Sequence, residues 1–379
     1  MKAKEKPALT TNCKYEFRRS KIRASTKKGT ALIVGSTGIS GGSLALELVR
    51  NNWRVLGLAR NPAAIPGVEP ISADLLDWSK LEKAVAGLDI THVFFCTWQR
   101  KATEAENIKV NGALLENLLT SLRSTRTLTH FALVTGTRHY LGPFEKGVQI
   151  SAETPFREEA PRLPMEHFYY TWEDMLFAAA KRQGFTWSVH RPNPIIGYAV
   201  GNAMNTAATI AIYAVICREM DRPFVFPGSP FHWDAAADVT DARQLARHLE
   251  WAALEPAAHN QAFNVINGDI FRWRWLWPKI GDYFGVKALP PDEANIPLEI
   301  GMKDAGPVWA EITRKHSLAE SNVERLATWW FADWDLRRQA SGLTDMSKSR
   351  RLGFTAYQET PDSFFHVFDQ LRDNKLIPR

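Results

Sequence analysis

A glycine-rich turn near the start of the chain has the spacing of a phosphate-binding loop. Gly35, Gly38 and Gly41 form a G-x-x-G-x-x-G sequence that directly follows the apolar run 31–34 and precedes an amphipathic segment. Such glycines allow a tight turn and close backbone approach, so that amide N–H groups and a helix dipole face a pyrophosphate. The strand–turn–helix context indicates dinucleotide binding. The alternative is a glycine-rich turn that holds no ligand.

The residue at the end of the second apolar run indicates which nicotinamide cofactor is bound. An NAD-binding protein places Asp or Glu there to accept a hydrogen bond from the ribose 2′-hydroxyl, whereas this chain has Arg60. A guanidinium pairs bidentately with a 2′-phosphate. We therefore expect NADP(H); the alternative is a surface arginine that happens to follow a strand. Asp74 and Leu75 are placed to meet the adenine, although an ordinary turn aspartate explains Asp74 equally simply.

The proton-transfer pair of ordinary short-chain dehydrogenases is missing. In those enzymes a Tyr and a Lys four residues later lie on one helical face, and the Lys lowers the pKa of the Tyr. The one Y-x-x-x-K here, Tyr283 with Lys287, lies far beyond the nucleotide domain, and Gly285 should break the helix between them. Where the catalytic helix should begin, Glu173 and Asp174 occupy the position of the Lys. The site is therefore inactive or uses another arrangement.

A series of short motifs runs through residues 30–379. They are THVFF (91–95) with Thr97-Trp98, EAEN (104–107) with Asn111-Gly112, TGT (135–137), HYLGPF (139–144), PRL (161–163), FYYT (168–171) with Glu173-Asp174, TWSVHRPN (186–193), FPG (226–228) and WWFAD (329–333). In order and spacing the chain resembles the progesterone 5β-reductase/iridoid synthase family. These are atypical extended short-chain dehydrogenase/reductases that reduce activated enones with NADPH.

The resemblance implies roles for particular residues. The family's catalytic Tyr aligns with Tyr170, with Tyr169 as the neighbour to test if the alignment is one residue off. Its phenol would donate to the substrate carbonyl oxygen while hydride reaches the β-carbon, which stabilises the developing enolate as an oxyanion hole does. Arg138 stands where the family has a Lys in T-G-T-K-H-Y, and Phe331 aligns with a Phe that covers the substrate. An Arg also supplies a positive field, but it is larger and stays charged.

Structural roles are the alternatives for the same residues. Tyr170 and Phe331 could be packing aromatics and Arg138 a salt-bridging loop residue, whereas His139 and His190 are expected to be structural. The chain has neither an H-x-x-x-H motif nor a carboxylate cluster, so no metal is expected. Tyr170 and Arg138 are therefore the predicted catalytic residues. The predicted cofactor-binding residues are Gly35, Thr37, Gly38, Ile39, Gly41, Arg60, Asp74, Leu75, Thr97, Trp98, Thr135, Pro192 and Ile195.

The predicted function is NADPH-dependent reduction of an α,β-unsaturated carbonyl compound at its β-carbon. Two alternatives share the fold and the cofactor: 1,2-reduction of aldehydes or ketones, and a non-catalytic NADP(H)-binding regulatory protein, which the Lys-to-Arg change motivates. The expected partner is a small apolar enone or enal, with no nucleic acid and no membrane span, and a homodimer is compatible with the sequence.

Apolar runs that alternate with amphipathic segments predict the elements that position these residues. Strands are expected at 31–34, 54–58, 91–96, 131–134 and 186–190, and helices at 42–51, 78–86, 103–122 and 167–182. This alternation is typical of a Rossmann-type, doubly wound parallel α/β sheet. Residues 30–200 are assigned to the NADP(H)-binding domain, with returning segments around 230–270. Residues 201–379 are assigned to a smaller, mostly helical substrate lobe, with helical patches near 245–253, 273–283 and 323–330.

Composition and charge restrict the class of protein. The net charge of +6 comes from a basic leader, predicted to be disordered over residues 1–29, because residues 1–28 carry ten Lys or Arg and two Glu. The rest of the chain is close to neutral, which argues against nucleic-acid binding. Three cysteines without C-x-x-C spacing fit a reducing compartment and a cytoplasmic protein. The most apolar stretch, 203–217, is too short for the ~20 residues of a membrane span and predicts a buried helix.

Overall fold

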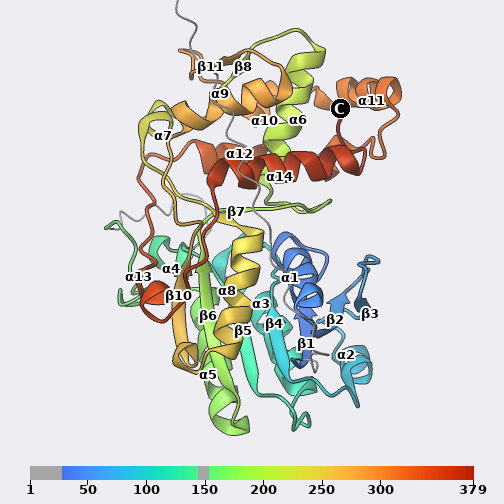
Figure 1. The fold of residues 1–379 in the computed structure, drawn as a ribbon, viewed down its shortest axis with the longest axis vertical. Coiled ribbons are helices and arrows are strands. Elements are labelled where there is room, and N and C mark those ends of the chain that lie inside the picture. The colour runs from blue at the N-terminus through green and yellow to red at the C-terminus, as the bar shows by residue number, and fades with distance from the viewer. Residues whose placement is uncertain (1–27, 144–152) are drawn as a thin grey trace, which may run out of the picture.

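Seven parallel strands form the central sheet of the computed structural model, which describes residues 28–143 and 153–379. Their order across the sheet is β10-β6-β5-β4-β1-β2-β3 (Figure 1), and the predicted doubly wound Rossmann fold is confirmed. The predicted leader lies almost entirely outside the described residues. The strands are β1 (Thr30–Val34), β2 (Arg54–Ala59), β3 (Val68–Ser72), β4 (His92–Phe95), β5 (His130–Val134), β6 (Thr186–Pro192) and β10 (Gln261–Val265).

The strand order reverses between β1 and β4, which pair in parallel with Ala31 opposite His92. From this point the chain builds β2 and β3 on one side and β5, β6 and β10 on the other. In open α/β sheets a ligand binds outside the carboxyl ends of the strands at such a switch point. The strands at the switch are fully buried, because helices cover both faces of the sheet.

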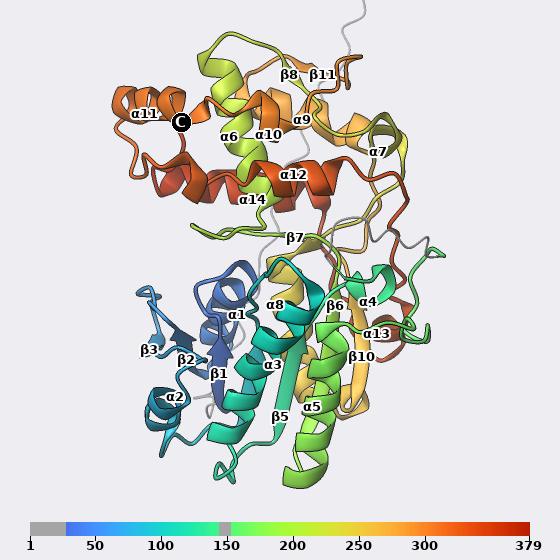
Figure 2. The ribbon, with the colours of Figure 1, turned by 180° about the vertical axis from the view of Figure 1, so that it is seen from behind.

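Two helical layers sandwich the sheet. One face carries α1 (Ile39–Arg50) and α8 (Ala242–Leu254), which pack side by side (Figure 1). The other face, toward the viewer in Figure 2, carries α3 (Glu104–Ser121) and α5 (Phe168–Gln183), with α2 (Trp78–Val85) beside α3. The predicted helices therefore exist, with ends that differ by a few residues. The largest shift is in α1, which begins three residues earlier because the turn leads directly into it.

A helical second lobe lies beyond the carboxyl ends of the strands (Figure 1). At its centre α6 (Thr206–Glu219) is buried from Thr206 to Cys217, which confirms the predicted buried helix. Trp277 and Trp309 are fully buried around it. The lobe's other helices are α7 (Pro230–Asp234), α9 (Trp273–Phe284), α10 (Leu298–Gly301), α11 (Ala305–His316), α12 (Trp329–Leu336) and α14 (Thr360–Asp373). The remaining short elements are α4 (Arg138–Leu141), β7 (Ile195–Ile196), β8 (Phe224–Val225), β9 (Thr240–Asp241), η1 (Pro256–Ala258), β11 (Ala288–Leu289), η2 (Val323–Arg325) and α13 (Ser347–Arg351).

Three parts of the sequence-based prediction need correction. The edge strand β3 is absent from the predicted strands, because its sequence, VEPIS, mixes polar residues and a proline with two apolar residues and lacks an apolar run. The helical patch expected at 323–330 is a 3-10 turn followed by α12, because Thr328 N–H bonds the Thr209 hydroxyl at 2.9 Å instead of continuing a helix. The edge strand β10 is also absent from the predicted strands, because its sequence, QAFNV, lacks a continuous apolar run. Its position is fixed by distant partners: the Asn264 side-chain amide donates to the carbonyls of Phe156 and Asp345, both at 3.0 Å.

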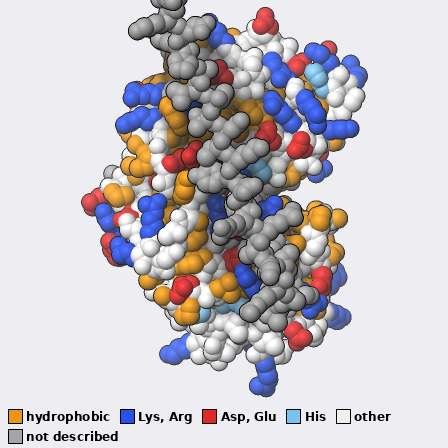
Figure 3. All heavy atoms as spheres, in the orientation of Figure 1, with side chains coloured by type: hydrophobic (Ala, Val, Ile, Leu, Met, Phe, Trp, Pro, Cys, Tyr) orange, Lys and Arg blue, Asp and Glu red, His pale blue; other side chains and the backbone are white. Residues whose placement is uncertain are grey.

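Basic side chains gather on the second lobe near α11 (Figure 3). The last turn of α11 carries Arg314, Lys315 and His316, where cations complement the negative end of the helix dipole. Lys315 and His316 also pair with Glu219 of α6, at 2.7 and 3.1 Å. These charges thus stabilise the contact between two helices. Among the described residues, none of the helices combines the length and apolar character needed to cross a bilayer.

Candidate active site

The glycine-rich turn forms a cradle between β1 and α1. Gly35 has a φ of +89°, in the left-handed region that favours glycine, and its N–H bonds Leu58 O at 2.9 Å. A Cβ on Gly41 would stand 2.2 Å from Gly35 O, so the helix reaches the turn only because residue 41 has no side chain. Gly38 caps α1, and the first turn of the helix holds no acidic residue. Backbone amides at a helix N-terminus that carries no acidic side chain fit a pyrophosphate.

Two cavities that share Thr97 and Trp98 cross the switch point. The smaller, about 120 Å³, lies at the ends of β1 and β2, and the larger, about 180 Å³, lies beside β4, β5 and β6. All predicted cofactor residues except Gly41 line one of the two. The smaller cavity takes Gly35, Thr37, Arg60, Asp74 and Leu75 in addition to the shared pair, and the larger takes Gly38, Ile39, Thr135, Pro192 and Ile195. An elongated dinucleotide fits a groove of this form.

The two residues expected near the adenine and ribose lie together in the smaller cavity. Arg60 follows β2 and is exposed, with its backbone carbonyl held by the Ser72 hydroxyl at 3.0 Å. Asp74 accepts a hydrogen bond from Leu76 N–H at 2.9 Å, as a turn aspartate does. The Arg60 guanidinium therefore remains the main charged group at this end of the groove, whereas Asp74 also has a structural role.

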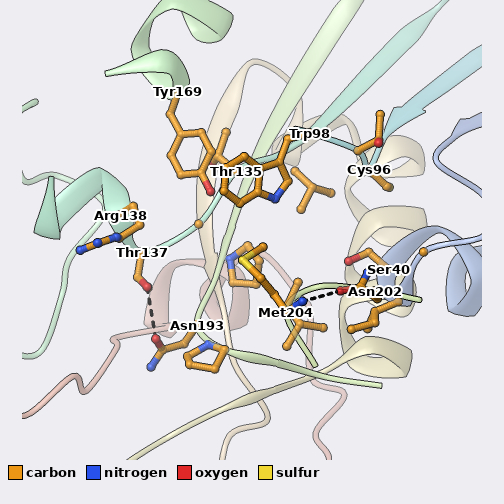
Figure 4. Close-up of a pocket in the computed structure, with 18 of the residues that line it drawn as sticks. Ser40, Cys96, Trp98, Thr135, Thr137, Arg138, Tyr169, Asn193, Asn202 and Met204 are labelled. Atoms are coloured by element: carbon orange, nitrogen blue, oxygen red, sulfur yellow. Dashed lines mark hydrogen bonds between the residues drawn. The ribbon is translucent and has the colours of Figure 1, made fainter. Parts of the chain in front are cut away.

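The larger cavity is closed by both lobes. The Rossmann side contributes Arg138, Leu141 and Tyr169 in addition to the cofactor residues. The second lobe and its linkers contribute Asn202, Met204, Phe331, Trp334 and Arg338. Figure 4 shows Tyr169, Thr135 and Trp98 directed toward a common space, with Asn202 and Met204 across from them. Phe331, which the resemblance implies as the residue over the substrate, lines this cavity from α12.

The tyrosine in this cavity is Tyr169, and Tyr170 lies outside it. The Tyr170 hydroxyl donates to His139 O at 2.7 Å and accepts from Leu163 N–H at 3.1 Å, so it joins α4 to the loop around Leu163. The Tyr169 hydroxyl makes no hydrogen bond to the described residues, and a Cβ on Gly136 would lie 3.3 Å from it. The structure therefore does not bring Tyr170 to the position predicted for it, and Tyr169 stands there instead.

The start of α5 decides which of the two tyrosines faces the cavity. Successive helical residues point about 100° apart, so the rotation of the first turn matters. The His167 side chain caps the helix by accepting from Tyr169 N–H at 3.0 Å, and Glu104 of α3 accepts from Phe168 N–H at 2.7 Å. Trp172 Nε1 donates to Asn111 O at 2.7 Å one turn later. These contacts fix α5 against α3 with Tyr169 toward β5.

Burial and a neighbouring cation act on the Tyr169 phenol in opposite directions. Burial raises the pKa of Tyr169, and the charge of Arg138 lowers it. Burial also lowers the pKa of Arg138 to about 10, so the guanidinium stays charged at neutral pH. Arg138 begins α4, directly after the Thr137 cap, and its carbon Cζ lies 5.1 Å from the Trp334 ring. A neutral phenol beside a fixed cation can donate a hydrogen bond to an oxygen that becomes negative.

A buried polar network connects this region to the second lobe. Thr137 Oγ1 donates to Asn193 Oδ1 at 3.2 Å (Figure 4). Asn193 Nδ2 donates to Asp238 Oδ1 at 2.5 Å and to Gly342 O at 2.9 Å. Burial raises the pKa of Asp238 to about 7. The network fixes the segment after α12 beside Arg138. Its sequence signal was weak: Asn193 appears only as the last residue of a family motif.

Several other sequence candidates have structural roles. Tyr283 donates to Asp369 at the surface, and Gly285 ends α9 in a left-handed conformation before Lys287, as predicted. His190 bonds Ser188 and His248 inside the core, at 2.9 and 3.0 Å. Asn111 accepts from Gln99 N–H and anchors the segment after β4. Within residues 28–143 and 153–379, no cluster of His, Cys, Asp and Glu could hold a metal ion.

The fold and the position of the groove agree with the comparisons to known proteins. The model of the PRISE-like Rossmann-fold domain matches residues 71–378. The chain belongs to this family. It is 40% identical over 366 residues to the (S)-8-oxocitronellyl enol synthase of Camptotheca acuminata, covering 93% of this chain and 94% of that protein. It is 38% identical over 365 residues to the 3-oxo-Delta(4,5)-steroid 5-beta-reductase of Arabidopsis thaliana, with the same coverage.

These relatives confirm the predicted membership of the progesterone 5β-reductase/iridoid synthase family and the predicted oxidoreductase-type enzyme. A solved UDP-glucose 4-epimerase of Bifidobacterium longum, in complex with NAD+ and UDP, shares the fold with a TM-score of 0.63 and 14% identity, covering 91% of this chain and 99% of that one. The Rossmann domain and the relatives support a nicotinamide dinucleotide as the cofactor.

Proposed function

We propose that this PRISE-like protein is an NADPH-dependent reductase that adds hydride to the β-carbon of an α,β-unsaturated aldehyde or ketone. One observation carries the proposal: the Tyr169 hydroxyl, with no partner among the described residues, opens into the larger cavity, which most of the predicted cofactor-binding residues also line. Two relatives whose names describe an enol synthase and a steroid 5-beta-reductase support the same reaction class.

The chain's own groups would act on the carbonyl oxygen of the substrate. When bound, NADPH supplies the hydride. Tyr169 donates a hydrogen bond to the oxygen on which negative charge develops, and Arg138 stabilises that charge electrostatically. The aromatic and apolar walls, including Trp98 and Phe331, exclude water and hold the conjugated chain beside the nicotinamide site. Tyr170 instead supports α4, the short helix that begins with Arg138, because its hydroxyl donates to His139 O within that helix.

The preference for NADP(H) over NAD(H) rests on Arg60. Its position after β2, at the end of the smaller cavity, is where an arginine can pair with the 2′-phosphate. No acidic side chain follows β2 at that position to accept from a free 2′-hydroxyl, since Asn61 comes next. The cytoplasmic location, the division into lobes at residue 200 and a homodimer stay predictions from the sequence.

The test is turnover by the purified full-length protein with NADPH and simple enones and enals, such as cyclohexenone and 2-hexenal. Cofactor oxidation is followed by absorbance and the product by gas chromatography. The proposal predicts the saturated carbonyl compound as the product. An allylic alcohol would instead establish 1,2-reduction, and tight NADPH binding with no turnover of any substrate would indicate a regulatory protein.

A further inference from the structure

The larger cavity is lined by two arginines, of which the proposed reaction requires one. Arg138 and Arg338 both line it, and its described lining residues include no Asp or Glu. Arg138 belongs to the Rossmann side, where it begins α4 and lines the cavity together with Thr135. Arg338 belongs to the segment after α12, on the second lobe. Reduction of a neutral enone needs one cation near the carbonyl oxygen, so the second guanidinium is available for another part of the substrate.

We propose that the substrate is an enone or enal that carries a carboxylate, and that Arg338 binds this carboxylate at the second-lobe end of the cavity. The proposal rests on the proposed function for the identity of the reacting group. It names the substrate class that this chain selects, an oxo-acid with a conjugated double bond.

Arg338 is held in place before any ligand arrives. Its Nη2 donates to Asp335 Oδ1 at 2.5 Å, and Asp335 Oδ2 in turn accepts from the Thr206 hydroxyl at 2.8 Å. The Arg338 backbone carbonyl accepts from the Ser229 hydroxyl at 2.6 Å. Four residues on, Gly342 O accepts from Asn193. Preorganisation of this kind reduces the entropy lost when a ligand binds.

Arg338 also has donors to spare. A guanidinium has five N–H donors, and within the described part of the chain Asp335 takes one of them. The side chain of Arg338 is 19% exposed, against 6% for Asp335. Arg338 lines the larger cavity, whereas its partner Asp335 does not. Guanidinium groups bind carboxylates through two parallel N–H bonds, which gives both affinity and geometric selection.

The two arginines flank one indole ring. The Cζ atoms of Arg138 and Arg338 lie 5.1 and 5.3 Å from the centroid of Trp334. Burial lowers the pKa of Arg138 most, and the charge of Arg338 lowers it further, as expected for two cations on either side of one ring. A bound anion at this end would be attracted by both guanidinium groups. Met204, Leu141 and Phe331 supply the apolar wall for the carbon chain between the carboxylate and the enone.

The phosphates of the cofactor do not account for Arg338. The pyrophosphate fits the turn at Gly38 and the start of α1, and the 2′-phosphate fits Arg60 in the smaller cavity. Both sites lie on the Rossmann side, whereas Arg338 comes from the second lobe. An anion at Arg338 is therefore a feature of the substrate.

The experiment compares (E)-8-oxooct-6-enoic acid with its methyl ester, which share the enal and differ in charge. With NADPH, the wild-type protein should show a kcat/KM at least about tenfold higher for the acid, as expected for one charge-assisted hydrogen-bonded pair. Arg338→Gln should bring the acid-to-ester ratio close to one, and Arg338→Lys should leave an intermediate ratio. Arg274→Gln, which removes an exposed arginine paired with Asp234 on the same lobe, is the matched control and should keep the wild-type ratio.

A second measurement separates this inference from the proposed function. Calorimetric binding of octanoate to the protein–NADP+ complex should weaken about tenfold or more in Arg338→Gln and stay unchanged in Arg274→Gln. Equal turnover of acid and ester overturns the carboxylate proposal and leaves the reductase standing. Arginine-dependent octanoate binding without turnover of either enal overturns the reductase and leaves the carboxylate site. Octanoate binding that is equally tight in the wild type and in Arg338→Gln overturns the proposed carboxylate site directly.

Discussion

A single methyl group at Gly41 should disable the nucleotide cradle. In Gly41→Ala the new Cβ would stand 2.2 Å from Gly35 O, 2.8 Å from Gly35 C and 3.1 Å from Ser36 Cα. All three atoms are backbone, so no side chain can rotate away, and the turn must move by roughly 1 Å to restore van der Waals contact. Overpacking of this kind costs about 1–3 kcal/mol. If the displaced turn is the one that holds the pyrophosphate, that cost corresponds to roughly 5- to 150-fold weaker NADPH binding.

The neighbouring glycine provides the matched control. In Gly42→Ala the Cβ meets Ser36 O at 3.5 Å, an ordinary contact, and the position lies in the same helix. Alanine inside a helix is favoured over glycine by roughly 0.5–1 kcal/mol, so this variant should be at least as stable as the wild type. NADPH affinity is measured by fluorescence titration and stability by thermal unfolding. If folded Gly41→Ala binds NADPH as tightly as the wild type, the assigned cradle is refuted. Equal losses of NADPH affinity in Gly41→Ala and Gly42→Ala would refute it as well.

Three further predictions concern the cofactor, the reaction and the fold. Arg60→Ala should raise KM for NADPH about tenfold and leave KM for NADH nearly unchanged, because the guanidinium acts only on the 2′-phosphate. Arg54→Ala, at the other end of β2, is the control. If the ratio of kcat/KM for NADPH to that for NADH is unchanged in Arg60→Ala, the assignment is contradicted. Arg138→Lys, which restores the residue of the family motif, should retain at least about a tenth of the wild-type kcat for cyclohexenone. Arg138→Met should lower kcat about 100-fold or more, because it removes the positive charge. Equal values of kcat in the two variants would show that the charge does not contribute to the reaction. Burial lowers the pKa of His92 to about 4 and of His248 to about 3, so the unfolded chain takes up protons first as the pH falls through 6.5. Each of these two histidines should reduce the free energy of unfolding by about 1.4 kcal/mol when the pH falls from 7.5 to 5.5. Burial raises the pKa of Asp238, so this residue should increase the free energy of unfolding over the same range. Urea unfolding at the two pH values checks this, and equal midpoints would contradict it.

Local patterns in the sequence predict where the residues of the proposed nucleotide groove lie in the sheet. The turn from Gly35 to Gly41, Arg60 and the residues after β4 each follow a strand directly, so their positions depend on the sheet alone. The sheet order then brings them to one edge. This is why predictions made from short segments place these residues along one groove.

The substrate half depends on contacts that no local pattern encodes. Whether Tyr169 or Tyr170 faces the cavity is decided by the rotation of α5, which Glu104 fixes from a segment 64 residues away. Arg338 reaches the cavity from a segment about 200 residues beyond Arg138, held by Asp335 and Ser229. The strand β10 likewise depends on bonds from Asn264 to Phe156 and Asp345. Such positions are set by tertiary packing and become visible only in the folded chain.

The most direct test of the account compares Tyr169→Phe with Tyr170→Phe in the same assay, NADPH with cyclohexenone. Each variant removes one hydroxyl, but only the Tyr169 hydroxyl opens into the cavity. We predict that Tyr169→Phe lowers kcat about 100- to 1,000-fold, the worth of one oxyanion donor, with unchanged NADPH affinity. Tyr170→Phe should lose about 1–3 kcal/mol of stability, because it leaves a buried carbonyl without its donor, while kcat stays within about threefold. Collapse of kcat in Tyr170→Phe with near wild-type turnover in Tyr169→Phe would contradict the central claim.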